Sequence, residues 1–230
     1  MPWIVFLNAL YEDHGLTIAT TCSGSIVSRS FIVSAAHCLF NPSTHKRPDS
    51  VDVFYNSSQV EDGPRMKAKI FAPHPDFVKS VYANDISVLK LEKPLHFDPF
   101  VSPVCLPKAP LNIFQKPLIV AGWGLTKEGG VGSDFLRYIL KTALPYDKCK
   151  PLLHKEAQEK LNGSIVICAR AKRQDACTGD SGGPMTTWGQ GEKLILVGII
   201  SFGYGCAREK DVSGYTRVAA FVPWIEAMMR

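Results

Sequence analysis

Ser181 has the surroundings expected of a nucleophile. It lies in the sequence GDSGGP, where an acid precedes it and two glycines follow it. A serine hydroxyl is a weak nucleophile at neutral pH, so its attack on a carbonyl group requires a base within hydrogen-bond reach. Histidine is the usual base for this purpose, and the chain has six histidines. A serine, a histidine and an acid together would carry out acyl transfer through a covalent intermediate.

The order of the candidates along the chain separates several kinds of hydrolase. GDSGG also fits the G-x-S-x-G turn of α/β-hydrolases, but that fold requires a histidine after the serine, and the last histidine is His154. The order acid, histidine, serine has few candidates for its acid, because only two acids precede His37. The order histidine, acid, serine is satisfied by His37 in SAAHC, Asp85 in NDISVLKL and Ser181. No H-E-x-x-H or similar ligand spacing occurs, so neither a metal nor a cofactor is expected.

Short apolar or β-branched runs recur between turn residues, as in WIVFLNAL, VDVFY and LILVGIISFG. Strands of this length and spacing indicate an all-β sandwich or barrel. Helical spacing of apolar residues is confined to AAFVPWIEAMMR at the C-terminus, and residues 145–162 have room for a second, short helix.

Together these motifs resemble the chymotrypsin-like (trypsin-fold) serine proteases. The resemblance spans nearly the whole chain and includes VCLP, AGWG and YTRV in the expected order. It implies one protease domain over residues 1–230 with an all-β fold of two six-stranded antiparallel β-barrels. The first barrel would cover about residues 1–105 and the second about 106–218, with a terminal helix over about 219–230.

The resemblance also implies a role for each residue of the site. His37 would be the general base and acid, and Asp85 would fix the tautomer of its imidazole. The backbone N–H groups of Gly179 and Ser181 would form the oxyanion hole. In active family members the acid at Asp180 pairs with a terminal ammonium that a proteolytic cut exposes. The chain opens MPWIVFL without an activation tetrapeptide, so we expect a fragment with a zymogen-like oxyanion loop and little activity.

By the same resemblance, Asp175 lies at the base of the primary specificity pocket, so cleavage after Arg or Lys is expected. Ala176 replaces a serine found in trypsin, which predicts a preference for Arg over Lys. Ser213 stands where a glycine is usual and would crowd the pocket. The other implied pocket residues are Ser201 near Asp85, Phe202 where an indole is usual, and Gly203 at an open entrance.

Seven cysteines without a C-x-x-C pair favour disulfides formed in an oxidising compartment. The resemblance pairs six of them as Cys22–Cys38, Cys149–Cys168 and Cys177–Cys206. Cys105 is left unpaired in this chain. In multidomain family members a cysteine in this motif ties the protease to an amino-terminal regulatory chain, and a free, buried thiol is the alternative. The sequons at Asn56 and Asn162 would be usable for N-glycosylation in that compartment.

The composition of the 230-residue chain, 46% hydrophobic and 20% charged, fits one folded, enzyme-sized unit. The net charge of +5 is dispersed, so no nucleic-acid partner is expected, and no apolar run approaches a membrane span.

The leading hypothesis is a secreted, extracellular endopeptidase of a proteolytic cascade, which cleaves proteins after Arg or Lys and is controlled by serpins or other protein inhibitors. The alternative is a catalytically weak or inactive homologue that acts as a protein-binding regulatory module.

Overall fold

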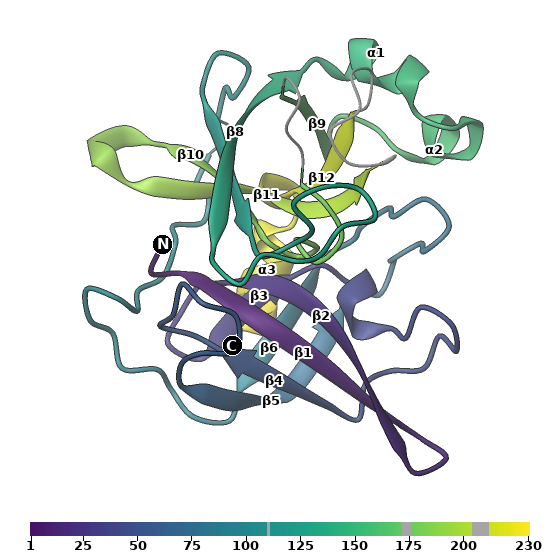
Figure 1. Ribbon diagram of the computed structural model, residues 1–230. Helices are drawn as coiled ribbons and strands as arrows, with labels where there is room; N and C mark the ends of the chain where they lie inside the picture. Colours follow the sequence, from purple (N-terminus) through teal and green to yellow (C-terminus); the bar gives the residue numbers. More distant parts are fainter. Residues whose placement is uncertain (110, 172–175, 204–211) are drawn as a thin grey trace.

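The structure is a computed structural model that describes residues 1–109, 111–171, 176–203 and 212–230. Its strands form two closed six-stranded barrels, which occupy the lower and upper halves of Figure 1. The spatial orders are β1-β2-β3-β6-β5-β4 and β10-β11-β12-β9-β8-β7, and neighbouring strands are antiparallel. The predicted all-β fold of two six-stranded antiparallel barrels is therefore confirmed.

The first barrel contains β1 (Ile4–Asp13), β2 (Leu16–Ile26), β3 (Phe31–Ser34), β4 (Ser50–Phe54), β5 (Arg65–Pro73) and β6 (Ser87–Leu91). The second contains β7 (Leu118–Gly122), β8 (Arg137–Leu144), β9 (Val166–Arg170), β10 (Pro184–Trp188), β11 (Leu194–Gly203) and β12 (Ser213–Arg217). The helices are α1 (Tyr146–Cys149), α2 (Lys155–Lys160) and α3 (Val222–Met228). The helical stretch expected over residues 145–162 thus contains two short helices.

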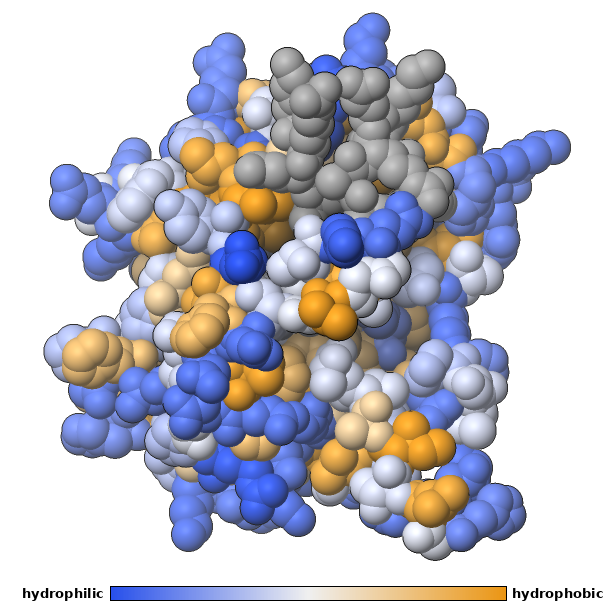
Figure 2. Space-filling view, viewed as in Figure 1, coloured by the Kyte–Doolittle hydropathy of each residue, from blue (hydrophilic) through white to orange (hydrophobic). Residues whose placement is uncertain are grey.

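The C-terminal segment packs against the core of the first barrel. Ile225 of α3 and Phe221 just before it belong to the same buried cluster as Val53 of β4 and Leu89 of β6. A short 3₁₀ turn precedes α3, and Pro223 lies in the first turn of the helix, where a missing N–H costs no hydrogen bond. In the described part of the chain no helix has the length and apolar character to cross a bilayer. Apolar residues on the face shown in Figure 2 occur in separate patches among hydrophilic ones.

His74 lies beside the C-terminal segment and couples its packing to pH. Its ring centroid is 5.3 Å from that of Phe221 and 4.8 Å from that of Trp224. Its Nδ1 accepts a hydrogen bond from the backbone N–H of Asp76 at 3.2 Å, which requires that nitrogen to carry no proton. Burial lowers the pKa of His74 below its usual value of 6.5, and the charge of Asp76 only partly offsets this effect.

The lowered pKa of His74 predicts a pH-dependent stability. Between that pKa and 6.5 the unfolded chain binds a proton that the folded chain does not, so the free energy of unfolding falls as the pH drops through this window. We expect His74→Gln to flatten the melting temperature between about pH 5 and pH 7, as measured by circular dichroism. The exposed His96 supplies the control variant His96→Gln, which should melt like the wild type. An unchanged slope in His74→Gln would assign the pH dependence to other groups.

Candidate active site

The pairing of β3 with β6 brings His37 and Asp85 together. Ser34, the last residue of β3, lies opposite Ser87, the first residue of β6. Because the two strands are antiparallel, the residues that follow Ser34 meet the residues that precede Ser87 at the same barrel edge. The Ser87 hydroxyl donates a hydrogen bond to the Ala35 carbonyl at 2.9 Å, which ties the two connecting segments together. The register of one strand pair thus places side chains that lie 48 residues apart in sequence.

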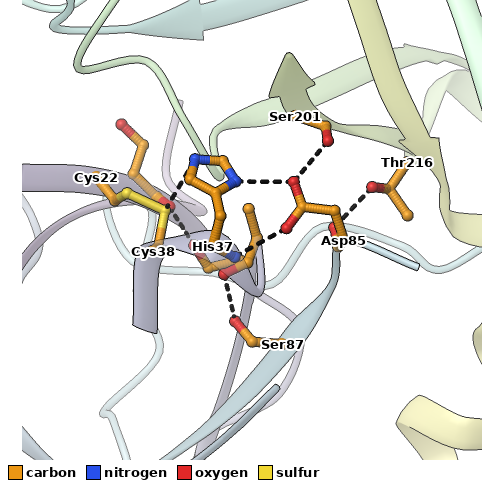
Figure 3. A network of polar contacts seen from close by, with 10 residues as sticks. Cys22, His37, Cys38, Asp85, Ser87, Ser201 and Thr216 are labelled. Carbon is orange, nitrogen blue, oxygen red and sulfur yellow. Dashed lines mark hydrogen bonds and ion pairs between the residues drawn. A yellow bond between two sulfur atoms is a disulfide. The ribbon is translucent and has the colours of Figure 1, made fainter. Parts of the chain in front are cut away.

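The carboxylate of Asp85 holds the imidazole of His37 in one orientation (Figure 3). The distance from His37 Nδ1 to Asp85 Oδ2 is 2.7 Å, and the His37 backbone N–H donates to Asp85 Oδ1 at 2.9 Å. An ionised carboxylate only accepts hydrogen bonds, so Nδ1 must carry the proton. The other ring nitrogen, Nε2, is then left with a lone pair that can take up a proton.

Two side chains of the second barrel hold Asp85 from the opposite side (Figure 3). The Ser201 hydroxyl of β11 donates to Asp85 Oδ2 at 2.5 Å, and the Thr216 hydroxyl of β12 donates to the Asp85 carbonyl at 2.6 Å. The side chain of Asp85 is fully buried, whereas that of His37 is 18% exposed. The expected hydrogen bond near Asp85 from Ser201 is therefore present. The histidine faces a cleft while its partner is enclosed.

Ser181 is carried by the second barrel but is anchored to the first. The Ser23 backbone N–H of β2 donates to the Ser181 carbonyl at 2.7 Å. Gly182 has a positive φ of 77°, and a Cβ at that position would lie 2.1 Å from the Ser34 hydroxyl oxygen. A larger residue would push the loop away from β3, the strand that leads to His37. Glycine after the serine is thus required by the close contact between the barrels.

The backbone N–H groups of Gly179 and Ser181 form no hydrogen bond with any residue that the structure describes. Gly179 adopts a positive φ of 98°, a conformation that favours glycine. Its neighbours in the loop are hydrogen-bonded, since the Leu125 N–H donates to the Thr178 carbonyl at 2.8 Å. Two amide donors beside the candidate nucleophile therefore remain available to a ligand.

His37 and Ser181 line one cleft at the junction of the barrels, with a volume of about 380 Å³. No hydrogen bond between His37 Nε2 and the Ser181 hydroxyl occurs among the described residues. Such bonds are often long in ligand-free enzymes and shorten when substrate binds. Tyr82 forms an aromatic wall of the cleft, because its ring centroid lies 5.4 Å from that of His37 and 6.0 Å from that of Phe202.

The predicted specificity residues fall partly on this cleft. Ala176, Phe202, Gly203 and Ser213 all line it, as does Ser201. The ring of Phe202 lies directly over Gly214, where a Cβ would come within 2.1 Å of the ring. Ser213 is buried, and its hydroxyl accepts a hydrogen bond from another side chain, that of Lys141, at 2.8 Å. Asp175, the predicted base of the pocket, lies outside the described residues.

Asp180 occupies a space that two glycines leave open. Its Oδ1 accepts from the Gly124 N–H at 2.8 Å, and its Oδ2 accepts from the Cys177 N–H at 2.9 Å. A Cβ at Gly122 would lie 2.1 Å from Oδ1, and one at Gly124 would lie 2.6 Å from the carboxyl carbon. The AGWG motif thus forms a backbone cradle for this carboxylate. Asp180 is partly exposed.

Filling this cradle should disturb the adjacent nucleophile. We expect Gly124→Ala to slow reaction at Ser181 by about 10²-fold, because a displacement of roughly 1 Å at a catalytic group has an effect of that size. The new Cβ would also lie 2.8 Å from the Asp180 backbone nitrogen, so the main chain that carries Ser181 must shift. Kinetics and thermal melting measured together separate this local shift from general unfolding. Gly132→Ala, whose Cβ would approach the Trp123 carbonyl oxygen only to 3.3 Å, is the control, and equal activity in both variants would contradict the cradle.

Two of the predicted disulfides are present in the structure, Cys22–Cys38 and Cys149–Cys168. Cys177 is also disulfide-bonded, while its predicted partner Cys206 lies outside the described residues. Cys105 is a free thiol on the surface, so the alternative of a buried thiol is wrong.

The one group of metal-ligand side chains found among the described residues is Cys22, His37 and Cys38. Since both of its sulfurs are in a disulfide, the group lacks the thiolates that metal binding requires.

Sequence reasoning missed three residues at this site. Tyr82 has no local signal, and Thr216 lies in the YTRV motif, which does not indicate its contact with Asp85, because only the folded chain places these residues beside His37 and Asp85. Burial, together with the negative charge of Asp85, raises the pKa of Tyr82 above 10.0. For Lys141, by contrast, the sequence does contain a signal. It lies between Ile139 and Ala143 at two-residue spacing, which puts all three on the inner face of a strand.

Comparison with known proteins agrees with this fold and motif order. The model of the family described as Trypsin matches residues 1–225. The chain belongs to the trypsin family of serine proteases. It is 32% identical over 229 residues to serine proteinase stubble of Drosophila melanogaster, and 29% identical over 237 residues to the suppressor of tumorigenicity 14 protein homolog of Bos taurus. These alignments cover 97% and 99% of this chain but only 29% and 26% of the two relatives.

Proposed function

We propose that this protein is a serine endopeptidase that hydrolyses peptide bonds through an acyl-enzyme. Ser181 is the nucleophile, His37 the general base and acid, and Asp85 the residue that positions His37. The observation that carries the proposal is the orientation of His37, whose Nδ1 lies 2.7 Å from a fully buried carboxylate. This contact directs the basic nitrogen toward the cleft that Ser181 lines. Membership of the trypsin family supports the same chemistry.

The proposed reaction begins when the Ser181 hydroxyl oxygen attacks the carbonyl carbon of the scissile bond and His37 Nε2 takes the hydroxyl proton. The tetrahedral intermediate collapses as the same proton passes to the leaving amine and the C–N bond breaks. Water then attacks the ester that remains on Ser181, with His37 again acting as base. The second collapse releases the carboxylic acid and returns the proton to the serine oxygen.

The backbone N–H groups of Gly179 and Ser181 serve, in this proposal, as the oxyanion hole. Both donors are uncommitted among the described residues; one belongs to Ser181 itself, and the other lies two residues before it in the chain. Preorganised donors of this kind stabilise the negative charge that develops on the carbonyl oxygen, and one of them contributes about 10²–10³-fold in rate.

Cleavage after Arg, and less readily after Lys, is the proposed specificity. It rests on Asp175, which lies outside the described residues, and on the neighbouring Ala176 at the cleft. A carboxylate can bind a guanidinium through two hydrogen bonds, whereas an ammonium loses the helper hydroxyl that serine provides in trypsin. Phe202 and Gly203 would flank the substrate side chain, and Ser213 would narrow its path.

Asp180 is proposed as the residue that links activity to proteolytic activation. Its carboxylate lies in the loop that carries Gly179 and Ser181, and two backbone N–H groups already hold it. A terminal ammonium that reached this carboxylate would stabilise the loop through a charge-assisted hydrogen bond. Without such a partner, the loop would favour a zymogen-like arrangement of low activity.

The setting proposed for this activity is extracellular. The disulfides Cys22–Cys38 and Cys149–Cys168 suit an oxidising compartment, and the sequon residues Asn56 and Asn162 are exposed. The free surface thiol of Cys105 is available for a disulfide to a regulatory chain, in a cascade that serpins or other protein inhibitors would control.

A peptide library tests the proposed activity and specificity together. The protein in its proteolytically activated form is incubated with peptides of varied sequence, and the fragments are identified by mass spectrometry. We expect fragments that end in Arg, fewer that end in Lys, and none after prior treatment with a fluorophosphonate. Cleavage without preference for a basic residue would contradict the specificity alone, and the absence of any fragment would contradict the peptidase.

A further inference from the structure

A second hollow, with a volume of about 300 Å³, lies on the second barrel. Its walls include Ile113, Ile167 and Val197, which belong to the buried core of this barrel, and the exposed Ala220. Arg217 is the only charged residue among the described residues that line it. Hollows of this size with apolar walls and a few polar groups are typical binding sites for small molecules.

The hollow and the candidate active-site cleft lie at different points along the neighbouring strands β11 and β12 (Figure 1). On β12, Ser213 is the first residue and lines the cleft, whereas Arg217 is the last residue and lines the hollow. On β11, Ser201 lines the cleft and Val197 lines the hollow. A strand rises by about 3.3 Å per residue, so each pair is separated by roughly 13 Å. A ligand in the hollow would therefore leave the cleft open.

The guanidinium of Arg217 is half-buried and forms no ion pair within the described part of the chain. Its Nε donates to the Gly163 carbonyl oxygen at 2.8 Å, and the two terminal nitrogens form no hydrogen bond with the described residues. Burial lowers the pKa of Arg217 below its usual value, and no charge among those residues opposes this effect. Arginine nevertheless stays protonated in proteins, so a positive charge lies beside apolar walls.

The contact with Gly163 does not by itself require an arginine. The Arg217 backbone N–H already donates to the Ile165 carbonyl oxygen at 2.8 Å, so the main chain holds the same segment against the end of β12. One side-chain donor is enough for one carbonyl oxygen, whereas a guanidinium has five. A partly buried charge is stabilised when it is paired and hydrogen-bonded. An anion in the hollow would supply that partner.

We propose that this hollow is a binding site for a small organic carboxylate with an apolar body. The two terminal nitrogens of Arg217 would each donate a hydrogen bond to one carboxylate oxygen, as the planar guanidinium favours. The apolar body would pack on Ile113, Ile167 and Val197. An inorganic anion would leave these walls without a partner, and a neutral apolar molecule would leave the guanidinium unpaired. The inference goes beyond the proposed peptidase, because neither His37 nor Ser181 lines the hollow.

The test uses hydrocinnamate, an aromatic carboxylate, and its neutral amide as probes, with dissociation constants measured by NMR titration of the wild-type protein. We expect hydrocinnamate to bind at least about tenfold more tightly than the amide, because only the carboxylate forms charge-assisted hydrogen bonds. Arg217→Met keeps an apolar stem without the charge, so the two affinities should become equal to within about twofold. Arg170→Met, which removes an exposed arginine that does not line the hollow, is the matched control and should preserve the wild-type difference.

Ala220→Phe repeats the test if Arg217→Met fails to fold, because it narrows the hollow from an exposed position and keeps the guanidinium. We expect it to weaken hydrocinnamate binding by at least about tenfold, as steric exclusion from the site predicts. Three results would overturn the inference: no saturable binding of hydrocinnamate to the wild type, equal binding of the two probes by the wild type, or undiminished hydrocinnamate binding by a folded Arg217→Met or Ala220→Phe variant. Neither probe needs the Ser181 hydroxyl, so these outcomes are separate from those that test the peptidase.

Discussion

Ser181→Ala is expected to lower kcat for peptide hydrolysis by about 10⁶-fold, since loss of the nucleophile in a serine, histidine and acid site has an effect of this size. The substitution removes the one oxygen that forms the acyl-enzyme. It removes no hydrogen bond within the described part of the chain, where the Ser181 contact to the first barrel is made by its backbone carbonyl. The melting temperature should therefore stay close to that of the wild type.

Kinetics on a chromogenic peptide substrate, with circular dichroism on the same samples, measure both parts of this expectation. Ser102→Ala, a serine whose side chain makes no hydrogen bond with the described residues, is the matched control and should keep full activity. A Ser181→Ala variant that retains more than about one part in 10³ of the wild-type kcat would show that another group performs the attack.

Asp85→Asn is expected to lower kcat by about 10⁴-fold, a magnitude carried over from the same change in this protease family. The hydrogen bonds of Asp85 explain why. Its Oδ2 accepts from His37 Nδ1 and from the Ser201 hydroxyl, and its Oδ1 accepts from the His37 backbone N–H. An asparagine has one oxygen for these two positions, so its NH₂ group must occupy the other.

Either orientation of the new amide loses a feature that the carboxylate provides at His37. If the NH₂ group points toward the His37 backbone N–H, two hydrogen-bond donors face each other and this contact is lost. With NH₂ toward the ring, His37 Nδ1 must give up its proton and Nε2 becomes protonated, so it can no longer act as the base. Asp147→Asn, at an exposed acid in α1, is the control for the charge change. An Asp85→Asn variant within tenfold of the wild-type kcat would contradict the positioning role of Asp85.

The sequence predicted the fold because short β-rich runs and ordered motifs extend over the whole chain. It also predicted that His37, Asp85 and Ser181 belong to one site. It did not predict how they meet. That depends on the register that sets Ser34 opposite Ser87, and on the contact of Gly182 with Ser34 between the barrels. Both are tertiary features that appear only when distant strands pair.

The cleft wall shows where the sequence analysis was incomplete. The run YILKTAL contains Lys141, to which the sequence analysis assigned no role. Two-residue alternation places Lys141 inward with Ile139 and Ala143, and the structure then directs its ammonium to Ser213. This hydrogen bond could not be identified from local sequence, because Ser213 follows Lys141 by 72 residues and lies on a different strand.

Reaction with a fluorophosphonate is the most direct test of an activated serine at this site. The protein in its proteolytically activated form is incubated with the reagent and digested, and the site of modification is mapped by mass spectrometry. The proposed mechanism predicts one covalent adduct per chain, located on Ser181, and no adduct when His37 is replaced by alanine. An unmodified Ser181 in the folded wild-type protein, or labelling that persists without His37, would contradict the proposal that His37 activates Ser181 for attack.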